Sequence, residues 1–470
     1  MPIAAENPRP SPIIAVTRSP YTTYQGFCSY VSGICTPNRS NVKESGLTGI
    51  IDWDLGSVTH LKSITAYEAY DGEFATVVSG APIPQQGLDN LQSHNQFSQE
   101  LDLTSTTTVA GRDLELAGGL YFLNSRTTLG GLVDIPVVFS FTQNDPATSK
   151  DESAFLHAIY KLSDAWSLEG GYRFTHEKRT FGYDHVMVYP TPGIPVFVFP
   201  PRAFVYNRND WKVGLSYQVD PRTMLYSSVA TGFKGGGVNP RPILPDQITT
   251  FDPETVTAYE LGFKSTLLGE ALRLNGAVFQ NNYKNLQTYL QGADAQALPL
   301  STVANSDARI RGAELELRAM PAEHLTINAT LGYLDFRYTN LRTLTLAVPA
   351  VPESATTVNV PKWKGTIGPQ YRVDLAGAGS LTGRVDWVYQ SRVFFNVQNS
   401  PLSAQNGYGV WNAGLTWASH DDLWQVQAQG FNLANKIYYA NMANQYSSFG
   451  VVDAVPGRPR EYRVTLRRNF

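Results

Sequence analysis

Residue types that commonly carry catalysis are present in this chain, but their spacing does not predict a catalytic site. The seven histidines show no H-E-x-x-H or comparable spacing that would hold a metal ion. There is no G-x-S-x-G motif and no convincing Ser/His/Asp set. The glycine-rich stretch 232–237 lacks the G-K-[ST] ending of a phosphate loop, and no helical pattern follows it. We therefore predict no enzyme activity, no metal site and no cofactor.

The chain has two cysteines, Cys28 and Cys35, in a stretch rich in glycine, serine and tyrosine. Because no histidine lies near either of them, metal chelation is not indicated. Two interpretations stay open, which are two unpaired thiols and a small loop disulfide. If the chain is exported to an oxidising compartment, the disulfide is favoured.

Composition excludes several functional classes and indicates strands rather than helices. The formal net charge of the 470 residues is −3, so nothing indicates a nucleic-acid partner. No apolar run is long enough for a transmembrane helix. Tyrosine and phenylalanine are plentiful, at 25 and 22 copies, and charged residues make up only 16%. This composition is typical of strands and turns.

Short turns recur along the chain between segments of about ten residues that alternate apolar and polar side chains. The turn segments are 54–57, 110–113, 162–165, 219–222, 268–270, 320–323, 376–379 and 419–422. Longer, less regular segments, expected to be loops, separate them: 72–95, 124–150, 183–202, 234–250, 292–305, 337–360, 397–406 and 435–457. Short turns at one end and long loops at the other are typical of an outer-membrane barrel.

The turns predict an all-β fold, an antiparallel transmembrane β-barrel of about 17 strands. The first strand is expected at about 46–55 and the last at about 459–470. With an odd number of strands, these two run in the same direction and cannot pair as antiparallel neighbours. We therefore expect an open seam along the last strand, or an irregular closure against residues before Gly46.

The last strand shows how the faces are expected to be arranged. Tyr462, Val464 and Leu466 fall on one face, and polar or charged residues alternate with them. In a membrane barrel the apolar face contacts lipid and the polar face contacts the lumen. Arg468 is the exception on the lipid face, which is tolerable within a few residues of the membrane interface.

Several motifs resemble those of TonB-dependent outer-membrane receptors. Residues 226–239 read YSSVATGFKGGGVN and resemble Y-x-S-x-x-x-G-F-K-G-G-x-x-N. Residues 253–265, PETVTAYELGFKS, resemble P-E-x-x-x-x-Y-E-L-G-x-K-S, and residues 311–316, RGAELE, resemble R-G-x-E-x-E. Residues 432–439, NLANKIYY, resemble N-L-x-N-K-x-Y-Y, and Phe470 matches the terminal aromatic residue that the barrel-assembly machinery reads.

The resemblance implies a receptor in the outer membrane of a Gram-negative bacterium that takes up a scarce ligand, most commonly a ferric siderophore. It implies the TonB–ExbB–ExbD complex, the barrel-assembly machinery and outer-membrane lipid or lipopolysaccharide as partners. Family barrels have 22 strands and an N-terminal plug. Residues 1–45 are too few for a plug and show no secretory signal. We therefore expect an irregular segment over 1–45, no plug domain, and a barrel portion over 46–470 that lacks about five strands.

Two groups of candidate site residues follow from the strand alternation, whereas the ligand-binding residues stay unknown. The charged residues expected in the lumen could contact a plug, a substrate or ordered water, or could fill a wet interior. They are Glu260, Lys264, Glu314, Glu316, Arg318, Arg384 and Asp386. The aromatic residues expected at the membrane interfaces could instead contact ligand in outer loops. They are Trp387, Trp411, Trp417, Trp424 and Tyr462.

Three alternative functions stay open beside the receptor. A passive porin would need an even, closed set of strands. An outer-membrane barrel enzyme would need acidic and histidine or serine and histidine groups at a rim. A soluble multi-blade β protein would not need detergent.

Overall fold

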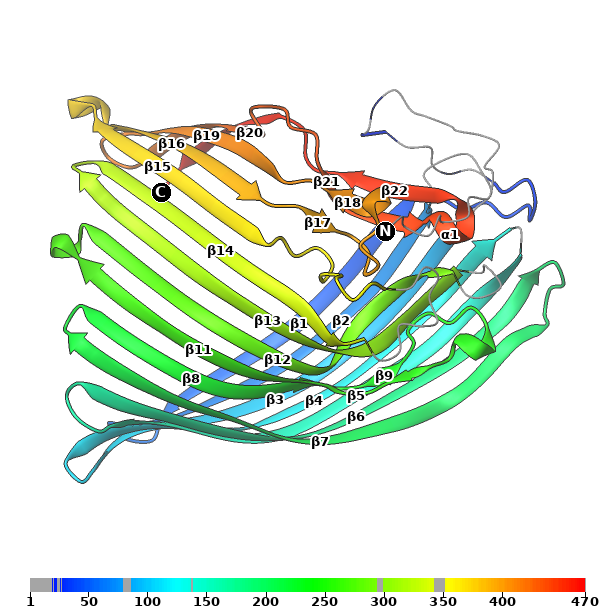
Figure 1. The fold of residues 1–470 in the computed structure, drawn as a ribbon, viewed down its shortest axis with the longest axis horizontal. Coiled ribbons are helices and arrows are strands. Elements are labelled where there is room, and N and C mark those ends of the chain that lie inside the picture. The colour runs from blue at the N-terminus through cyan, green and yellow to red at the C-terminus, as the bar shows by residue number, and fades with distance from the viewer. Residues whose placement is uncertain are drawn as a thin grey trace.

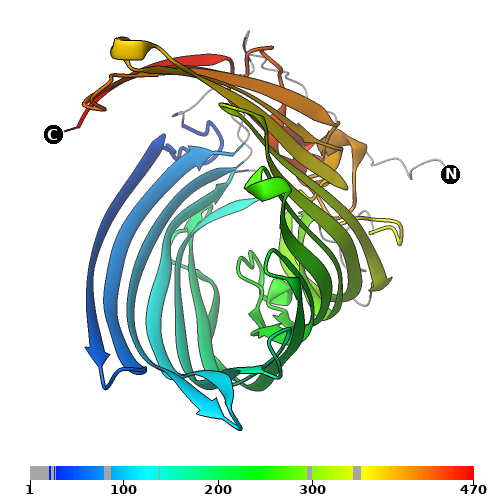
Figure 2. The ribbon, with the colours of Figure 1, turned by 90° about the vertical axis from the view of Figure 1, so that its left-hand side faces the viewer.

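One curved antiparallel sheet of 17 strands makes up most of the molecule and forms the wall of a barrel (Figures 1 and 2). The computed structural model describes residues 19, 21–22, 26, 28–78, 86–136, 138–293, 299–341 and 351–469. The all-β prediction is confirmed. No helix in these ranges is long and apolar enough to cross a membrane.

Each strand of the sheet pairs antiparallel with the next one in chain order. The strands are β1 (Arg39–Asp54), β2 (Thr59–Val77), β3 (Gly87–Val109), β4 (Arg112–Ile135), β5 (Phe139–Lys161), β6 (Trp166–Tyr189), β7 (Pro195–Asp220), β8 (Thr223–Lys234), β11 (Glu254–Leu267), β12 (Leu272–Ala293), β13 (Pro299–Ala322), β14 (Leu325–Asn340), β15 (Trp363–Asp374), β16 (Ser380–Gln390), β19 (Tyr408–Ala418), β20 (Trp424–Phe431) and β23 (Glu461–Arg468).

Small elements decorate the connections between these strands. Three two-stranded sheets lie in the long connections: β9 (Gly237–Val238) with β10 (Thr250–Phe251), β17 (Val393–Phe394) with β18 (Ala404–Gln405), and β21 (Tyr439–Gln445) with β22 (Val451–Pro456). Short helical turns are η1 (Pro245–Gln247), η2 (Leu268–Glu270), η3 (Ala376–Ala378), η4 (Pro401–Ser403) and α1 (Tyr446–Phe449).

The sheet has two free edges, β1 and β23. Within the described residues, β1 pairs only with β2 and β23 only with β20, and no ladder joins the two. Since every pairing reverses the strand direction, an odd number of strands leaves β1 and β23 running the same way. Figure 2 shows the two edges without a strand between them. The expected open seam is therefore present.

Strand boundaries differ from the sequence expectation at the first strand and in two of the segments expected to be loops. β1 begins at Arg39, inside the stretch expected to be irregular, and its residues 39–45 pair with β2 despite their polar composition. The segments 124–150 and 183–202, expected to be loops, are mostly strand. The β4–β5 ladder continues without a break to Ile135 and Phe139. Cross-strand hydrogen bonds extend these hairpins where apolar alternation has already stopped.

Strands β3 to β7 are 23–26 residues long, whereas a tilted strand needs about ten residues to cross a bilayer. Their hairpins are therefore longer than a bilayer crossing needs, and they project at the long-loop end, on the right of Figure 1. They carry a buried apolar cluster of Val133, Ile135, Phe139 and Phe141, which gives this end a packed core of its own.

The position of the segment between β8 and β11 identifies the lumen face of the sheet. This green segment lies inside the ring of strands in Figure 2. Val238 packs against Tyr183 and Phe197, and Gly235 lies against the carboxylate of Glu177. Residues that share a face with Tyr183 and Glu177 therefore point into the lumen.

Aromatic rings cover glycines on the lumen face of two family-like motifs. A Cβ at Gly262 would lie 2.5 Å from the ring of Tyr226 on the neighbouring strand. A Cβ at Gly312 would lie 2.3 Å from the ring of Phe279. Phe279 therefore faces the lumen, while Val278 faces outward and is exposed. The register thereby assigns both faces of β12.

We expect the outward face to behave as a lipid-contacting surface. Leu261, near the middle of β11, is 58% exposed. Leu261→Lys should destabilise the membrane-reconstituted chain by about 2–4 kcal/mol, because it moves a charge into lipid. Urea unfolding in phospholipid vesicles measures this change. The control is Ser228→Lys, which places the same charge on the lumen face opposite Glu260 and should cost less than about 1 kcal/mol. Equal losses would show that the faces are assigned wrongly.

Candidate functional site

A cavity of about 200 Å³ lies at the long-loop end of the lumen. Its walls come from the ends of β3, β4, β5, β12, β13 and β21, together with the segment after β9. The lining residues are Val78, Gln86, Leu88, Asn90, Leu129, Val133, Phe141, Gln143, Arg241, Pro242, Ile243, Tyr289, Gln291, Gly292, Leu300, Ser301, Ala443 and Gln445. Neutral amides and apolar side chains dominate this surface, so it suits a ligand with both kinds of group.

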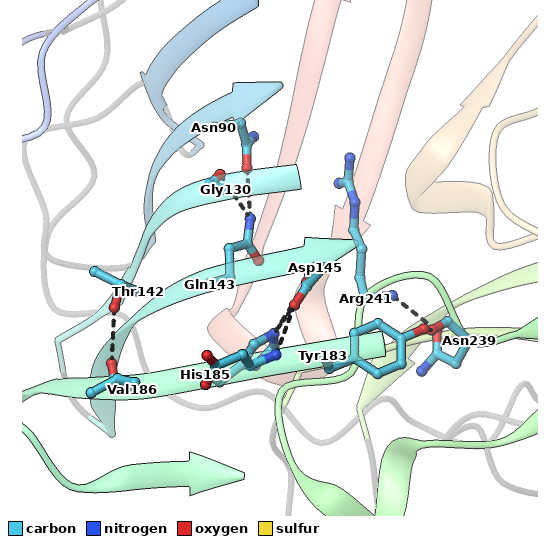
Figure 3. A network of polar contacts seen from close by, with 11 residues as sticks. Asn90, Gly130, Thr142, Gln143, Asp145, Tyr183, His185, Val186, Asn239 and Arg241 are labelled. Carbon is cyan, nitrogen blue, oxygen red and sulfur yellow. Dashed lines mark hydrogen bonds and ion pairs between the residues drawn. The ribbon is translucent and has the colours of Figure 1, made fainter. Parts of the chain in front are cut away.

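Two of the amides are held in place by the sheet (Figure 3). Gln143 Nε2 donates to Asn90 Oδ1 at 3.3 Å and to the backbone oxygen of Gly130 at 3.4 Å. Register explains the contact, because Gln143 and Asn90 both lie opposite Gly131 on the intervening strand β4. The missing side chain at Gly131 gives the two amides the space to meet across it.

A buried Asp–His pair supports the wall beside the cavity (Figure 3). His185 Nε2 lies 3.1 Å and 3.2 Å from the two carboxylate oxygens of Asp145, and the side chains are 1% and 9% exposed. A carboxylate accepts, so Nε2 carries the proton. The rings of Phe141 and Phe197 lie 4.7 Å and 4.3 Å from the imidazole. The pair thereby joins β5 to β6 in a dry environment.

A chain of hydrogen bonds connects this wall to the segment that carries Arg241. The hydroxyl of buried Tyr183 donates to the backbone oxygen of Asn239. Asn239 Nδ2 donates to the backbone oxygen of Gln247 at 2.8 Å, and its Oδ1 accepts from the backbone nitrogen of Arg241 at 3.3 Å. The backbone position of Arg241 therefore depends on Tyr183, 58 residues away in sequence.

The charge of the cavity is set by Arg241, the one charged residue among the described residues that line it. Its side chain is exposed, and no ion pair within the described residues involves it. A guanidinium suits carboxylate or phosphate oxygens, and the amides can donate to further oxygens. The arrangement can bind an anionic or polar ligand with apolar parts. It offers no paired nucleophile and base.

The predicted lumen residues on β11 and β13 share the face that points into the lumen. Lys264 and Glu316 both lie opposite Asn275, and Glu260 lies opposite Phe279. Glu314 and Arg318 lie two residues before and after Glu316 on the same strand, so all three share one face. None of them lines the cavity at the long-loop end, and their role stays a prediction.

Arg384 and Asp386, both predicted to face the lumen, form an ion pair with each other. Arg384 Nε donates to both carboxylate oxygens of Asp386, at 3.0 Å and 2.8 Å, and Nη2 donates to one of them at 2.7 Å. Register places both residues on the lumen face of β16, where Asp386 lies opposite Asn412. A bidentate pair of this kind leaves little charge for a ligand.

The predicted interface aromatics occupy the outward face. Trp387 lies directly opposite Trp411, and Trp417 Nε1 donates to the backbone oxygen of Ala378 in a short turn at 2.9 Å. Tyr462 on the free edge is 72% exposed. Arg468, the charged exception on this face, lies with its guanidinium 5.1 Å from the ring centre of Trp424. This contact gives the cation a partner near the strand end.

Two further predicted features lie at the ends of the chain. A disulfide joins Cys28 and Cys35, and Ser32 between them donates to Asp134 Oδ2 at 3.1 Å, so the loop contacts the end of β4. Phe470, the expected assembly signal, lies outside the described residues.

The cavity residues were missed in the sequence because Asn90, Gln143 and Gln291 fall in or beside segments expected to be loops, and Arg241 falls inside one. Asp145 and His185 are 40 residues apart and meet only through the β5–β6 register. The one available signal was the glycine-rich run before Arg241, which indicates a sharp entry of the backbone into the lumen.

Comparison with known proteins gives a consistent family assignment. The family described as "TonB dependent receptor-like, beta-barrel" matches residues 17–433. The pesticin receptor of Yersinia enterocolitica is 27% identical over 302 residues, which are 62% of this chain and 42% of that protein. A probable TonB-dependent siderophore receptor of Acinetobacter baumannii, PiuA, is 22% identical over 54% of this chain and 33% of its own length.

Solved structures share the fold. The ferric yersiniabactin uptake receptor FyuA from Yersinia pestis superposes with a TM-score of 0.76 at 20% identity, covering 91% of this chain and 61% of that one. The siderophore receptor PiuA superposes with a TM-score of 0.70 at 16% identity, covering 94% and 69%. The chain spans less than half the length of the curated relatives it matches.

Loss of the Tyr183 hydroxyl should loosen the segment that carries Arg241. Because Tyr183→Phe leaves the backbone oxygen of Asn239 without its donor, we expect a local loss of about 1–2 kcal/mol. Hydrogen exchange over residues 238–249 should then be about 5–30 times faster. The control Tyr172→Phe removes an exposed hydroxyl that donates to Asn209 Oδ1 and should not change this segment. Unchanged exchange in Tyr183→Phe would show that this hydrogen bond does not stabilise the segment.

The β21–β22 hairpin beside the cavity should depend on pH through Asp453. Burial raises the pKa of this carboxyl from 3.8 to about 6, and one of its oxygens has no hydrogen-bond partner within the described residues. Because the folded pKa lies above the unfolded one, stability falls as pH rises from about 4 to 6 and then levels off. At pH 7.5, Asp453→Asn should stabilise the hairpin by about 1–3 kcal/mol. Hydrogen exchange of residues 439–456 at pH 4.5 and 7.5 measures this stability. An equal change in stability between the two pH values in wild type and Asp453→Asn would contradict the prediction.

Proposed function

Because the chain belongs to the TonB-dependent receptor β-barrel family, we propose that it acts as the barrel of an outer-membrane receptor for a scarce ligand, a ferric siderophore. Members of this family are transport receptors rather than enzymes. The cavity at the long-loop end carries the proposal, since it is the site in the described lumen that combines one unpaired cation with several amide donors and apolar walls. In a barrel of this kind that end faces the outside of the cell.

The chemistry of the cavity supports an anionic metal chelate as ligand. Arg241 supplies a positive charge for carboxylate or phenolate oxygens. Asn90, Gln143 and Gln291 supply neutral donors, and Tyr289 with Phe141 supplies aromatic surface. Similar proteins include the ferric yersiniabactin uptake receptor and the siderophore receptor PiuA. The iron is cargo that the chelator carries, so no metal ligands from the chain are required.

The remaining parts of the proposal concern the setting. The receptor lies in the outer membrane of a Gram-negative bacterium, in contact with lipopolysaccharide. Its folding uses the barrel-assembly machinery, and energised uptake uses the TonB–ExbB–ExbD complex. Because the chain spans part of its relatives' length, the coupling itself is not assigned to any described residue. The lumen residues Glu260, Glu314 and Glu316 would meet whatever fills or crosses the lumen.

Direct binding tests the receptor proposal. The full chain, folded in detergent, is titrated with ferric citrate and with ferric yersiniabactin, and quenching of intrinsic fluorescence gives Kd. Arg241→Gln should weaken binding at least tenfold, because it removes a charge-assisted hydrogen bond. The control is Arg112→Gln, an exposed arginine paired with Asp164 at the short-turn end, which should leave Kd unchanged.

Two outcomes would overturn the proposal. One is the absence of binding for both ferric chelates, and the other is equal binding by wild type and Arg241→Gln. Ligand-independent swelling of liposomes that contain a well-folded product would favour a passive channel instead.

A further inference from the structure

A second cavity, of about 780 Å³, lies at the short-turn end of the lumen wall, far along the strands from Arg241. It spans the short-turn ends of β7, β8, β11, β12 and β13 and the turns between them. The lining residues are Gln218, Pro221, Arg222, Met224, Lys264, Ser265, Thr266, Glu270, Arg273, Asn275, Arg318 and Met320. Four of them are cations and one is a carboxylate, so the cavity is strongly positive.

The cations on the strands point into the lumen. Lys264 lies opposite Met224 and Asn275, and Asn275 in turn lies opposite Glu316. Arg273 lies directly opposite Arg318. Side chains that face each other across neighbouring strands share a face, so Lys264, Arg273 and Arg318 all belong to the lumen face. They extend into the water-filled interior rather than into lipid.

The pairing of these cations differs from that of several other cations on the lumen wall. Lys212 Nζ lies 2.6 Å from Glu169 Oε1, Arg208 pairs with Asp210, and Arg384 pairs with Asp386. Within the described residues, no carboxylate forms an ion pair with Lys264, Arg273, Arg318 or Arg222. Lys264 Nζ lies 5.9 Å from the ring centre of Tyr226. Those three cations are thus paired with carboxylates, whereas the four cations of this cavity lie close together without such partners among the described residues.

Direct opposition of Arg273 and Arg318 is unfavourable on its own. Like charges at directly opposite positions destabilise a sheet, and water and salt reduce this cost only in part. An anion between the two guanidinium groups would convert the repulsion into attraction. Guanidinium groups offer forked donors that match carboxylate and phosphate oxygens, and Lys264 adds a third positive charge.

We propose that this cavity is a binding site for a small multivalent oxyanion, one with two or more carboxylate or phosphate groups. The cations stand on three successive strands, which lie about 4.8 Å apart, so one oxyanion group would not reach all of them. Thr266, Asn275 and Gln218 add neutral donors along the same surface. The site is separate from the Arg241 cavity, and its existence does not depend on the proposed receptor function.

The position also suggests what the site does. An anion that enters at the long-loop end and leaves at the short-turn end passes this cavity last. A weak, multivalent site there would hold it near the exit without a deep pocket. This role rests on the proposed function, whereas anion binding itself does not.

Calorimetric titration of the full chain in zwitterionic detergent tests the proposal. Citrate represents carboxylates and pyrophosphate represents phosphates, at constant ionic strength in chloride. The Arg241→Gln background removes the other cationic cavity. We expect binding of at least one of the two anions, weakened at least tenfold by Arg273→Gln together with Arg318→Gln. The anion that binds more tightly identifies the preferred group.

Thermal unfolding gives a second measurement. It distinguishes a binding site from a group of solvated surface charges, whose Tm would not respond to the anions in this way. In chloride at low ionic strength, the protein with Arg273→Gln and Arg318→Gln should have a higher Tm than the Arg241→Gln parent, because the repulsion between the two guanidinium groups is gone. Citrate or pyrophosphate should raise the Tm of the parent and leave the variant unchanged. Lys212→Gln, which removes a paired lumen cation, serves as the control and should keep full anion binding.

Several outcomes would overturn the proposal. These are no binding of either anion, equal binding by parent and double variant, and loss of binding in Lys212→Gln to the same degree. If the double variant does not fold, Lys264→Gln replaces it, and unchanged anion affinity there would count against the site. Failure of ferric chelates to bind at Arg241 would leave these results unaffected, so the two proposals fail separately.

Discussion

The backbone hydrogen-bond ladder is the interaction on which the rest of this structure depends. In a bilayer, each peptide N–H and C=O must be paired within the protein, and a barrel wall meets this requirement by pairing each strand with its neighbours. Sixteen successive antiparallel ladders from β1 to β23 meet this requirement on both sides of every strand from β2 to β20. They leave the outer edges of β1 and β23 without partners in the described residues. The direction of these edges limits what can cover them. A second copy in the same membrane orientation offers only parallel edges, whereas an antiparallel insert must contain an odd number of strands.

The same ladder explains why the outer cavity exists. Alternation along each strand sorts side chains to lipid or lumen, but it does not bring particular residues together. Register does, because it places Asn90 and Gln143 on either side of Gly131 and brings His185 against Asp145. The extra length of β3 to β7 then places these groups on paired strands at the long-loop end. Side chains on such a wall are held more rigidly than on a free loop, which favours binding. The Tyr183–Asn239 contact passes that rigidity to the segment bearing Arg241.

The fold can be predicted from the sequence where the signal is local, but not where it depends on strand pairing. Turn residues and two-residue alternation are local, and they predicted the number of strands, their direction and the seam. They also placed Glu260, Lys264 and Glu316 on a common face. The outer hairpins lack clear alternation, so segments 124–150 and 183–202 looked like loops, although cross-strand bonds make them strands. Residues 39–45 were missed for the same reason. The cavity could not be predicted, since Arg241 and Gln143 meet there only through the fold.

Charge placement along the lumen separates structural residues from available ones. Lys212 with Glu169 and Arg384 with Asp386 neutralise each other, and such pairs keep a wet wall stable without attracting a ligand. Arg241 at one end and Arg273 with Arg318 at the other have no such carboxylate among the described residues. A barrel whose net charge is −3 thus presents positive cavities at both mouths. Because the intervening wall carries Glu260, Glu314 and Glu316, an anion would meet attraction at the mouths and repulsion between them. Passage of an anion would then require those carboxylates to be covered or neutralised while it crosses.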